Sequence, residues 1–165
     1  SSMPHGTSGR LKALATTGAK RSKGAPELPT MAESGFPGFD VSAWYALLSA
    51  NDAHHGKAKR FLEALSGTLL TSNYVVAETA NLLRYRLGMP VALEFLTMLR
   101  QTALVEVLMV TAEQHDRTID LFEEQGSKGL SFTDCSSLVL MREQGLPKAF
   151  CFDTDFERAG VACVP

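Results

Sequence analysis

From residue 36 onward, short runs of apolar residues alternate with longer stretches whose apolar residues recur every three or four positions. The short runs have the length of strands, and the longer stretches have the period of helices that bury one face. Strands that alternate with helices in this way form parallel sheets, because each crossover between parallel strands is usually a helix. The pattern therefore predicts one α/β domain over residues 36–165, built on a mostly parallel sheet.

The same pattern predicts where the individual elements lie. Strands are expected at residues 35–39, 68–71, 104–110 and 149–152, with a last edge strand at 161–164. Helices are expected at residues 42–50, 54–65, 74–87, from Pro90 through Leu99, 111–125 and 133–144. Three of these helices are followed by Gly88, Gly126 or Gly145, as is common where a helix ends in a left-handed residue.

Residues 1–35 differ from the rest in charge and composition. They contain five basic and two acidic residues, a net charge of +3, whereas residues 36–165 have a net charge of -5. Their few large apolar residues cannot bury enough surface to offset the entropy lost on ordering. We therefore predict that residues 1–35 are a basic N-terminal extension, a tag or a tail outside the domain.

Composition excludes several classes of protein. The three cysteines form no C-x-x-C pair and no zinc spacing with the four histidines, which argues against a secreted disulfide scaffold and a zinc domain. No apolar run approaches the roughly 20 residues that a membrane helix needs. We therefore expect a cytoplasmic protein with no membrane segment.

Two acidic residues directly follow predicted strands. Asp40 comes after the first strand, and Asp153 comes after the apolar run of residues 149–152. In open α/β sheets, ligands bind outside the carboxyl ends of the strands, at the point where the strand order reverses. Both carboxylates are therefore expected at a ligand site.

Two further acids are predicted on inward helix faces. Glu78 lies four residues from Tyr74 and Leu82, inside an apolar stripe, and Asp134 begins a helix whose inward face continues through Leu138. Burying an ionised carboxylate without a partner costs several kcal/mol. The basic residues are not spaced to neutralise all four acids, so we expect a bound cation. Oxygen ligands without His or Cys favour Mg²⁺ or Mn²⁺.

Structural roles explain some of these acids equally well. Asp40 stands where it can cap the helix that follows, and Asp134 stands where an acid stabilises a helix N-terminus. Asp153 and Asp155 fit an ordinary turn. Glu78 has no comparable structural explanation, and the conjunction of the four acids favours one site.

Four stretches, taken in order and spacing, resemble the PIN-domain ribonucleases, and most closely the VapC-type toxins of prokaryotic toxin-antitoxin pairs. They are Phe39-Asp40-Val41-Ser42-Ala43-Trp44, Asn73-Tyr74-Val75-Val76-Ala77-Glu78-Thr79, Leu130-Ser131-Phe132-Thr133-Asp134-Cys135 and Phe152-Asp153-Thr154-Asp155-Phe156. The resemblance covers residues 36–165. It implies a three-layer α/β/α fold with a central, mostly parallel sheet of four to five strands.

The resemblance also implies a site and an activity. Asp40, Glu78, Asp134 and Asp153 match the family's acidic quartet, which binds one or two Mg²⁺ or Mn²⁺ ions and hydrolyses RNA. Ser42 matches a small hydroxyl residue beside the first acid, and Asp155 is auxiliary. An antitoxin protein and a second copy of the chain are the partners that such toxins have.

The RNA-binding residues are less well specified. Arg84 on the helix of Glu78, and Lys57 and Arg60 on an earlier helix, are candidates for contacts with phosphates, although a solvated helix face explains each of them too.

The competing function is a PIN-fold RNA- or protein-binding module with weak or no turnover. A phosphatase with an aspartyl nucleophile is disfavoured, because residue 42 is Ser where such enzymes carry a second Asp.

Overall fold

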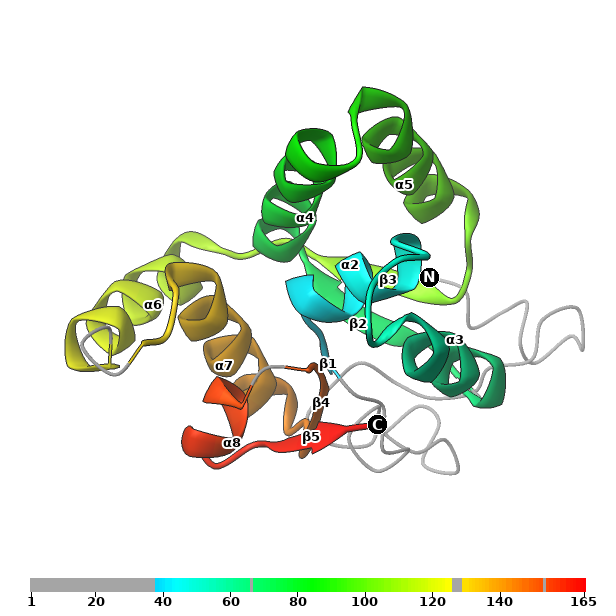
Figure 1. Ribbon diagram of the computed structural model, residues 1–165. Coiled ribbons are helices and arrows are strands. Elements are labelled where there is room, and N and C mark those ends of the chain that lie inside the picture. The colour runs from blue at the N-terminus through cyan, green and yellow to red at the C-terminus, as the bar shows by residue number, and fades with distance from the viewer. Residues whose placement is uncertain (1–37, 66, 126–128, 153) are drawn as a thin grey trace, which may run out of the picture.

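The computed structural model describes residues 38–65, 67–125, 129–152 and 154–165 (Figure 1). The predicted extension at 1–35 lies outside these ranges. In chain order the elements are β1 (Gly38–Phe39), α2 (Val41–Leu48), α3 (His55–Ala64), β2 (Leu69–Ser72), α4 (Asn73–Arg86), α5 (Met89–Gln101), β3 (Val105–Leu108), α6 (Ala112–Gln125), α7 (Phe132–Gln144), β4 (Lys148–Phe150), α8 (Asp155–Arg158) and β5 (Ala162–Val164).

The five strands form one sheet in the order β3-β2-β1-β4-β5, and every neighbouring pair is parallel. From β1 the chain steps outward to β2 and β3, and it then returns to place β4 on the other side of β1. The strand order therefore reverses between β1 and β4. The predicted parallel sheet of four to five strands is confirmed.

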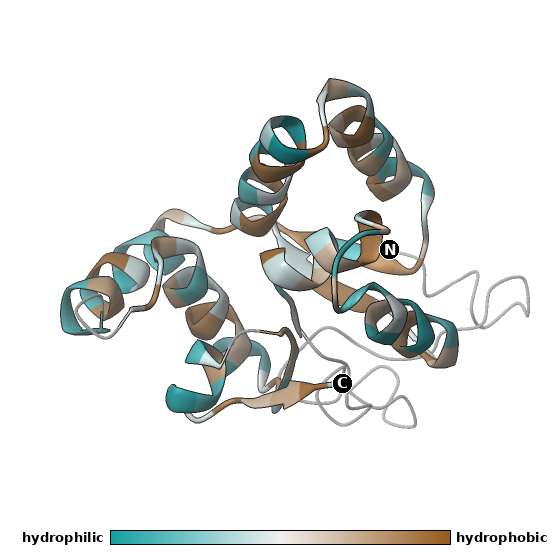
Figure 2. Cartoon of the chain, in the orientation of Figure 1, coloured by the Kyte–Doolittle hydropathy of each residue, from teal (hydrophilic) through white to brown (hydrophobic). Residues whose placement is uncertain are grey.

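Successive side chains of the strands point to opposite faces of the sheet and so divide the core into two halves. In β2, Leu69 packs with the helices α2 to α5, whereas its neighbour Leu70 packs with residues of α6, α7 and α8. In β4, Phe150 faces the first group and Ala149 the second. Figure 1 shows α4 and α5 above the strands and α7 and α8 to the left of them, and Figure 2 shows apolar residues on the strands. Successive side chains of a strand point to opposite faces, so this arrangement has three layers, as expected.

Local signals in the sequence explain where the helices near the sheet begin and end. Ser72 caps α4 by accepting a hydrogen bond from the backbone N–H of Val75 at 3.2 Å. The helix α7 begins with a capping box at Ser131 and ends at Gly145, whose φ of 65° is left-handed. The predicted helices and strands that the structure describes in full agree with the observed bounds to within two residues.

The short helix α8 and the packing of Trp44 complete the description of the fold. The four-residue helix α8 was not predicted, since four residues are too few to show a helical period. Trp44 is 1% exposed and packs edge-on against Phe95 with ring centroids 5.2 Å apart, so it is a core residue. None of the helices in the described ranges has the length and apolar character that crossing a membrane would require.

Candidate active site

The candidate site lies where the strand order reverses. Asp40 directly follows β1 and is the N-cap of α2, with the extended backbone that an N-cap residue adopts. Its backbone N–H donates to the carbonyl oxygen of Phe150 at 3.3 Å, so the end of β1 lies against the end of β4. The predicted position of Asp40, at the carboxyl edge of the sheet beside the reversal, is confirmed.

One carboxylate oxygen of Asp40 accepts two hydrogen bonds. Its Oδ2 accepts a hydrogen bond from the Ser42 hydroxyl at 2.8 Å and another from the Ser42 backbone N–H at 3.3 Å. The same hydroxyl accepts a hydrogen bond from the backbone N–H of Phe152 at 3.2 Å. Ser42 therefore holds the carboxylate of Asp40 in one orientation and links it to the chain just after β4.

The other oxygen of Asp40 is buried and has no hydrogen-bond partner among the described residues. Asp40 is only 5% exposed. The pKa of its carboxyl group is raised from 3.8 to about 6, mainly by burial; the hydrogen bond from Ser42 opposes this rise and the charge of Asp134 adds to it. A buried carboxylate oxygen without a donor is the arrangement expected of a cation ligand.

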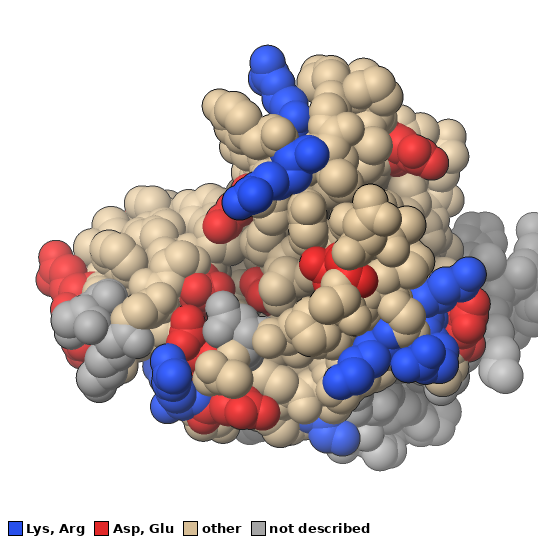
Figure 3. All heavy atoms as spheres, viewed as in Figure 1, with Lys and Arg blue, Asp and Glu red and all other residues tan. Residues whose placement is uncertain are grey.

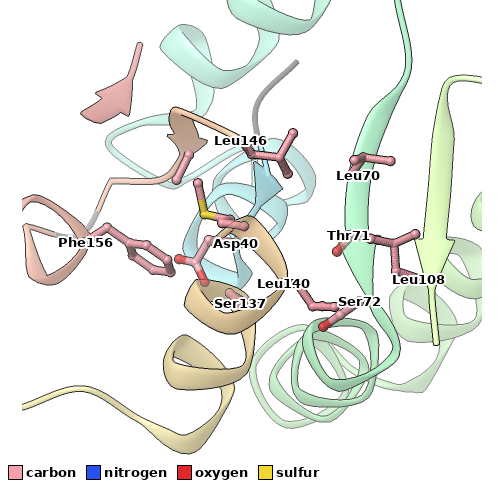
Figure 4. A pocket seen from close by; sticks show the side chains of 11 residues that line it. Asp40, Leu70, Thr71, Ser72, Leu108, Ser137, Leu140, Leu146 and Phe156 are labelled. Carbon is pink, nitrogen blue, oxygen red and sulfur yellow. The ribbon is translucent and has the colours of Figure 1, made fainter. Parts of the chain in front are cut away.

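Asp40 borders a small cavity of about 30 Å³, enough for roughly two water-sized groups. Figure 4 shows its carboxylate between Phe156 and Ser137, with β2 across the cavity. The polar residues of the wall are Asp40, Thr71, Ser72 and Ser137, and the others are Leu70, Leu108, Leu140, Met141, Leu146, Ala149 and Phe156. The cavity is therefore mainly apolar, with hard oxygen atoms as its polar groups.

Asp134 has two roles that the sequence left as alternatives. Its Oδ2 accepts a hydrogen bond from the backbone N–H of Ser131 at 2.8 Å, and its own N–H donates to the Ser131 hydroxyl at 3.1 Å, which completes the capping box of α7. The charge of Asp134 nevertheless acts on Asp40. Ser137, which lines the cavity, lies three residues later on the same helix face. Capping and proximity to Asp40 therefore coexist.

The prediction that Glu78 is buried is wrong. The buried stripe of α4 consists of Val75, Thr79 and Leu83, spaced four residues apart, whereas Glu78 is exposed. Glu78 lies three residues after Val75, on the border of the stripe, where a long side chain reaches solvent. Its position in the site is therefore not supported by burial.

The remaining acids do not complete a cluster within the described residues. Asp155 is mostly buried at the start of α8 and forms an ion pair with Arg158 at 2.8 Å. Asp153 lies outside the described residues. Over the described ranges, no three His, Cys, Asp or Glu side chains lie close enough together to hold a metal ion. The members of the expected quartet that the structure shows to interact are Asp40 and Asp134.

The candidate RNA contacts are all exposed. Lys57 and Arg60 lie on α3, and Arg84 lies in the last turn of α4. Figure 3 shows basic side chains over α3 and over α4, with acidic atoms in the region between them. A polyanion that spans these helices would pass over the acidic region.

Sequence reasoning missed the hydroxyl residues of the cavity wall and an aromatic cluster near it. Thr71, Ser72 and Ser137 carry no distinctive signal, because hydroxyl residues are common at strand ends and helix starts. The Tyr74 hydroxyl lies 2.7 Å from Nδ1 of His115, and both rings contact Phe132. Nothing in the sequence pairs Tyr74 with His115, since they are 41 residues apart.

Comparisons with known proteins agree with the fold. The PIN domain family model matches residues 39–162. The chain is 36% identical over 121 residues to the 23S rRNA-specific endonuclease VapC20 of Mycobacterium tuberculosis, which covers 73% of this chain and 92% of that protein. The crystal structure of that VapC20, described as a sarcin-ricin loop cleaving toxin, matches with a TM-score of 0.71 and 35% identity over 76% of this chain and 95% of the other.

A more distant structure shares the fold. FitAcB from Neisseria gonorrhoeae matches with a TM-score of 0.58 and 17% identity, over 79% of this chain and 97% of the other. The resemblance noted in the sequence is therefore confirmed by the family match, by a relative over most of the chain and by the structures. The chain belongs to the PIN domain family.

Proposed function

We propose that the chain is a Mg²⁺- or Mn²⁺-dependent endoribonuclease and that it is the toxin of a toxin-antitoxin pair. The observation that carries the proposal is the buried Oδ1 of Asp40, which has no hydrogen-bond partner in the described part of the chain and lies beside a cavity whose polar groups are oxygens. A relative that matches most of the chain is named as an endonuclease specific for 23S rRNA. We therefore propose structured RNA, and ribosomal RNA in particular, as the substrate.

The proposed ligands differ in how strongly the structure supports them. Asp40 would hold the cation through Oδ1, because Oδ2 is occupied by Ser42. Asp134 is proposed as a second ligand because its charge acts on Asp40. Glu78 and Asp153 are proposed as further ligands, directly or through water, on the strength of the family resemblance alone. Oxygen ligands of this kind suit Mg²⁺ and Mn²⁺.

The chemistry follows from the charges involved. When bound, a divalent cation acidifies a water molecule and screens the negative charge that builds on the phosphate oxygens during attack. Ser42 keeps the Asp40 carboxylate aimed at the cavity. Because the pKa of Asp40 is raised to about 6, the group is mainly ionised at neutral pH and loses its charge in mild acid. Arg84, Lys57 and Arg60 are proposed to bind phosphates on either side of the cut.

The partners and location are part of the same proposal. An antitoxin protein with a basic segment would complement the negatively charged site, and we propose that the chain forms a homodimer in the cytoplasm. The alternative is a PIN-fold module that binds RNA or protein without turnover. A nuclease and an RNA-binding module both predict RNA binding, so cleavage is the property that separates them; a protein-binding module predicts neither.

The decisive experiment compares cleavage by the parent and by Asp40→Asn. The substrate is a synthetic RNA hairpin with the sequence of a 23S rRNA loop, incubated with Mg²⁺ or Mn²⁺, with and without chelator, next to a DNA hairpin of equal sequence. We expect RNA cleavage that is lost with chelator and in Asp40→Asn. Asp116→Asn, which removes an exposed carboxylate of α6, is the matched control and should cleave normally.

Each other result has a defined meaning. Binding of the RNA hairpin without cleavage under all metal conditions would favour the binding module. Cleavage that resists the chelator would refute metal dependence. Equal loss of activity in Asp116→Asn would show that the effect of Asp40→Asn is not specific to the site.

A further inference from the structure

Two cysteine sulfur atoms meet at the edge of the sheet. Cys163 lies in β5 opposite Ala149 of β4, and Cys151 follows β4, where its backbone N–H donates to the carbonyl oxygen of Val164 at 3.2 Å. Both side chains belong to the core half formed with α6, α7 and α8. Their Sγ atoms are 2.6 Å apart.

This separation is shorter than packing produces. Uncharged heavy atoms that only pack against each other lie about 3.5–4.0 Å apart, whereas the sulfur atoms of a disulfide are bonded at about 2.05 Å. Closing the bond requires the two Sγ atoms to approach by about 0.5 Å from the observed 2.6 Å. The pairing of β4 with β5 places Cys163 opposite Ala149, two residues before Cys151, so the two cysteines are diagonal neighbours on the same side of the sheet.

We propose that Cys151 and Cys163 are a modification site, at which a peroxide converts the two thiols into an intramolecular disulfide. The inference rests on the geometry of β4 and β5 and does not depend on the proposed nuclease function. It distinguishes this pair from Cys135, the third thiol, which is fully buried in α7.

The exposure of the two thiols sets the order of the steps. Cys163 is partly exposed and meets the peroxide first, whereas Cys151 is 2% exposed. The Cys163 sulfur attacks one peroxide oxygen, the O–O bond breaks, and the leaving hydroxide takes up the thiol proton as water. The Cys151 sulfur then attacks the sulfenic sulfur of Cys163, the S–O bond breaks, and a second water leaves. Two thiols and one hydrogen peroxide thus give one disulfide and two waters.

Burial is expected to slow the first step. It raises the pKa of the Cys163 thiol, which the hydrogen bond with Cys151 partly offsets. Since thiolates are the reactive form, the pair should oxidise more slowly than an exposed, acidic cysteine. Oxidation by hydrogen peroxide is therefore to be followed over hours and not only over minutes.

The disulfide would fasten one edge of the sheet. The strand β5 has three residues, and among the described strands it pairs only with β4. Ala149, the register partner of Cys163, also lines the cavity beside Asp40. A bond that closes a loop of about 13 residues stabilises mainly by restricting the unfolded chain, and we expect Tm to rise by about 5–10 °C on oxidation.

The test treats the full chain with hydrogen peroxide and then counts thiols and measures mass. In the parent, the number of thiols that alkylate after denaturation should fall from three to one, with a mass loss of about 2 Da and no added oxygen. Peptide mapping without reduction should join the peptides of Cys151 and Cys163. Reductant should restore three thiols and the original Tm.

Two variants keep the result specific. Cys135→Ala is the matched control and should still form the bond, leaving no thiol. In Cys163→Ser, a substitution at a partly exposed position, peroxide should not raise Tm. The proposal is overturned if the folded parent keeps all three thiols, if sulfur gains oxygen without losing two hydrogens, if Cys135 is found in the bond, or if the disulfide joins two chains.

Discussion

Ser42 donates its hydroxyl proton to Oδ2 of Asp40 across 2.8 Å, and the two residues are joined a second time through the Ser42 backbone N–H. The hydroxyl oxygen also accepts from the backbone N–H of Phe152, 110 residues later in the chain. One small side chain thus fixes the acid after β1 and the segment after β4 relative to each other. The orientation of Oδ1 toward the cavity is a consequence of this arrangement.

Replacing Ser42 by Ala should weaken both the fold and the site. The N–H of Phe152 loses its acceptor, so the free energy of unfolding should fall by about 1–3 kcal/mol. The pKa of Asp40 should rise above its present value of about 6, because the Ser42 hydrogen bond lowers it. Denaturant unfolding measures the first effect, and the acid limb of a cleavage-pH profile measures the second. Ser42→Thr keeps a hydroxyl and should restore both; if it behaves like Ser42→Ala, the hydroxyl is not the cause.

The raised pKa of Asp40 predicts how stability depends on pH without metal. Between pH 4 and pH 6 the folded state binds the Asp40 proton more tightly than the unfolded state does, so stability falls as pH rises through this window. A pKa change from 3.8 to about 6 corresponds to about 3 kcal/mol. The parent should therefore lose stability relative to Asp40→Asn from pH 4 to about pH 7, and the difference should stay constant at higher pH. If stability depends on pH in the same way in the parent and in Asp40→Asn over this range, the pKa of Asp40 is not raised by burial.

Two buried threonines offer a matched test of unsatisfied hydroxyl groups. Thr79 and Thr118 are both 0% exposed, but the Thr79 hydroxyl has no partner within the described structure, whereas Thr118 donates to the Gln114 carbonyl oxygen at 2.7 Å. Replacing a buried, unpaired hydroxyl by a methyl group removes a desolvation cost. Thr79→Val should raise the free energy of unfolding by about 1 kcal/mol, and Thr118→Val should not raise it. Equal effects in thermal unfolding would show that the two hydroxyls are equally well satisfied.

Because Glu78 is exposed, a substitution there can test its role in metal binding without disturbing the fold. Glu78→Gln should change the free energy of unfolding by less than about 0.5 kcal/mol, as expected of an exposed residue without a special role in the fold. If Glu78 is a ligand, the same substitution should raise the Mg²⁺ concentration needed for half-maximal cleavage. Glu94→Gln, an exposed acid of α5, is the control. A metal requirement equal to that of the parent would remove Glu78 from the proposed ligand set.

The sequence predicted the parallel sheet and the position of Asp40, because these depend on hydrophobic periodicity and on where the strands end. Alternating strand and helix periods fix a parallel sheet, and an acid directly after a strand must lie at the carboxyl edge, which is why Asp40 was placed correctly. Periodicity does not determine the border of a buried stripe. Glu78 follows Val75 by three residues, and only the packing of α4 decides that Thr79, and not Glu78, faces inward. The capping role of Asp134 was recognisable in the sequence, but its electrostatic contact with Asp40 depends on how α7 meets β1.

The double role of Asp134 can be separated by two substitutions at the same position. Asn retains an oxygen that accepts from the Ser131 N–H but has no charge, so Asp134→Asn keeps the capping box and relieves the repulsion with Asp40. Its metal-free Tm should equal or exceed that of the parent, and the pKa of Asp40 should fall. Ala has neither the charge nor an oxygen that accepts from the Ser131 N–H. Asp134→Ala should therefore lower the free energy of unfolding by about 1 kcal/mol, because this part of the helix cap is lost.

Ser131→Ala provides the complementary control, since it removes the capping hydroxyl and leaves both carboxylates in place. It should lower Tm about as much as Asp134→Ala does, yet retain cleavage per folded molecule, whereas Asp134→Asn should retain Tm and lose cleavage. Thermal unfolding without metal and cleavage with Mg²⁺, measured on the same preparations, separate the two roles. If Asp134→Asn loses stability as Ser131→Ala does and still cleaves RNA, Asp134 is a helix cap and has no part in the site.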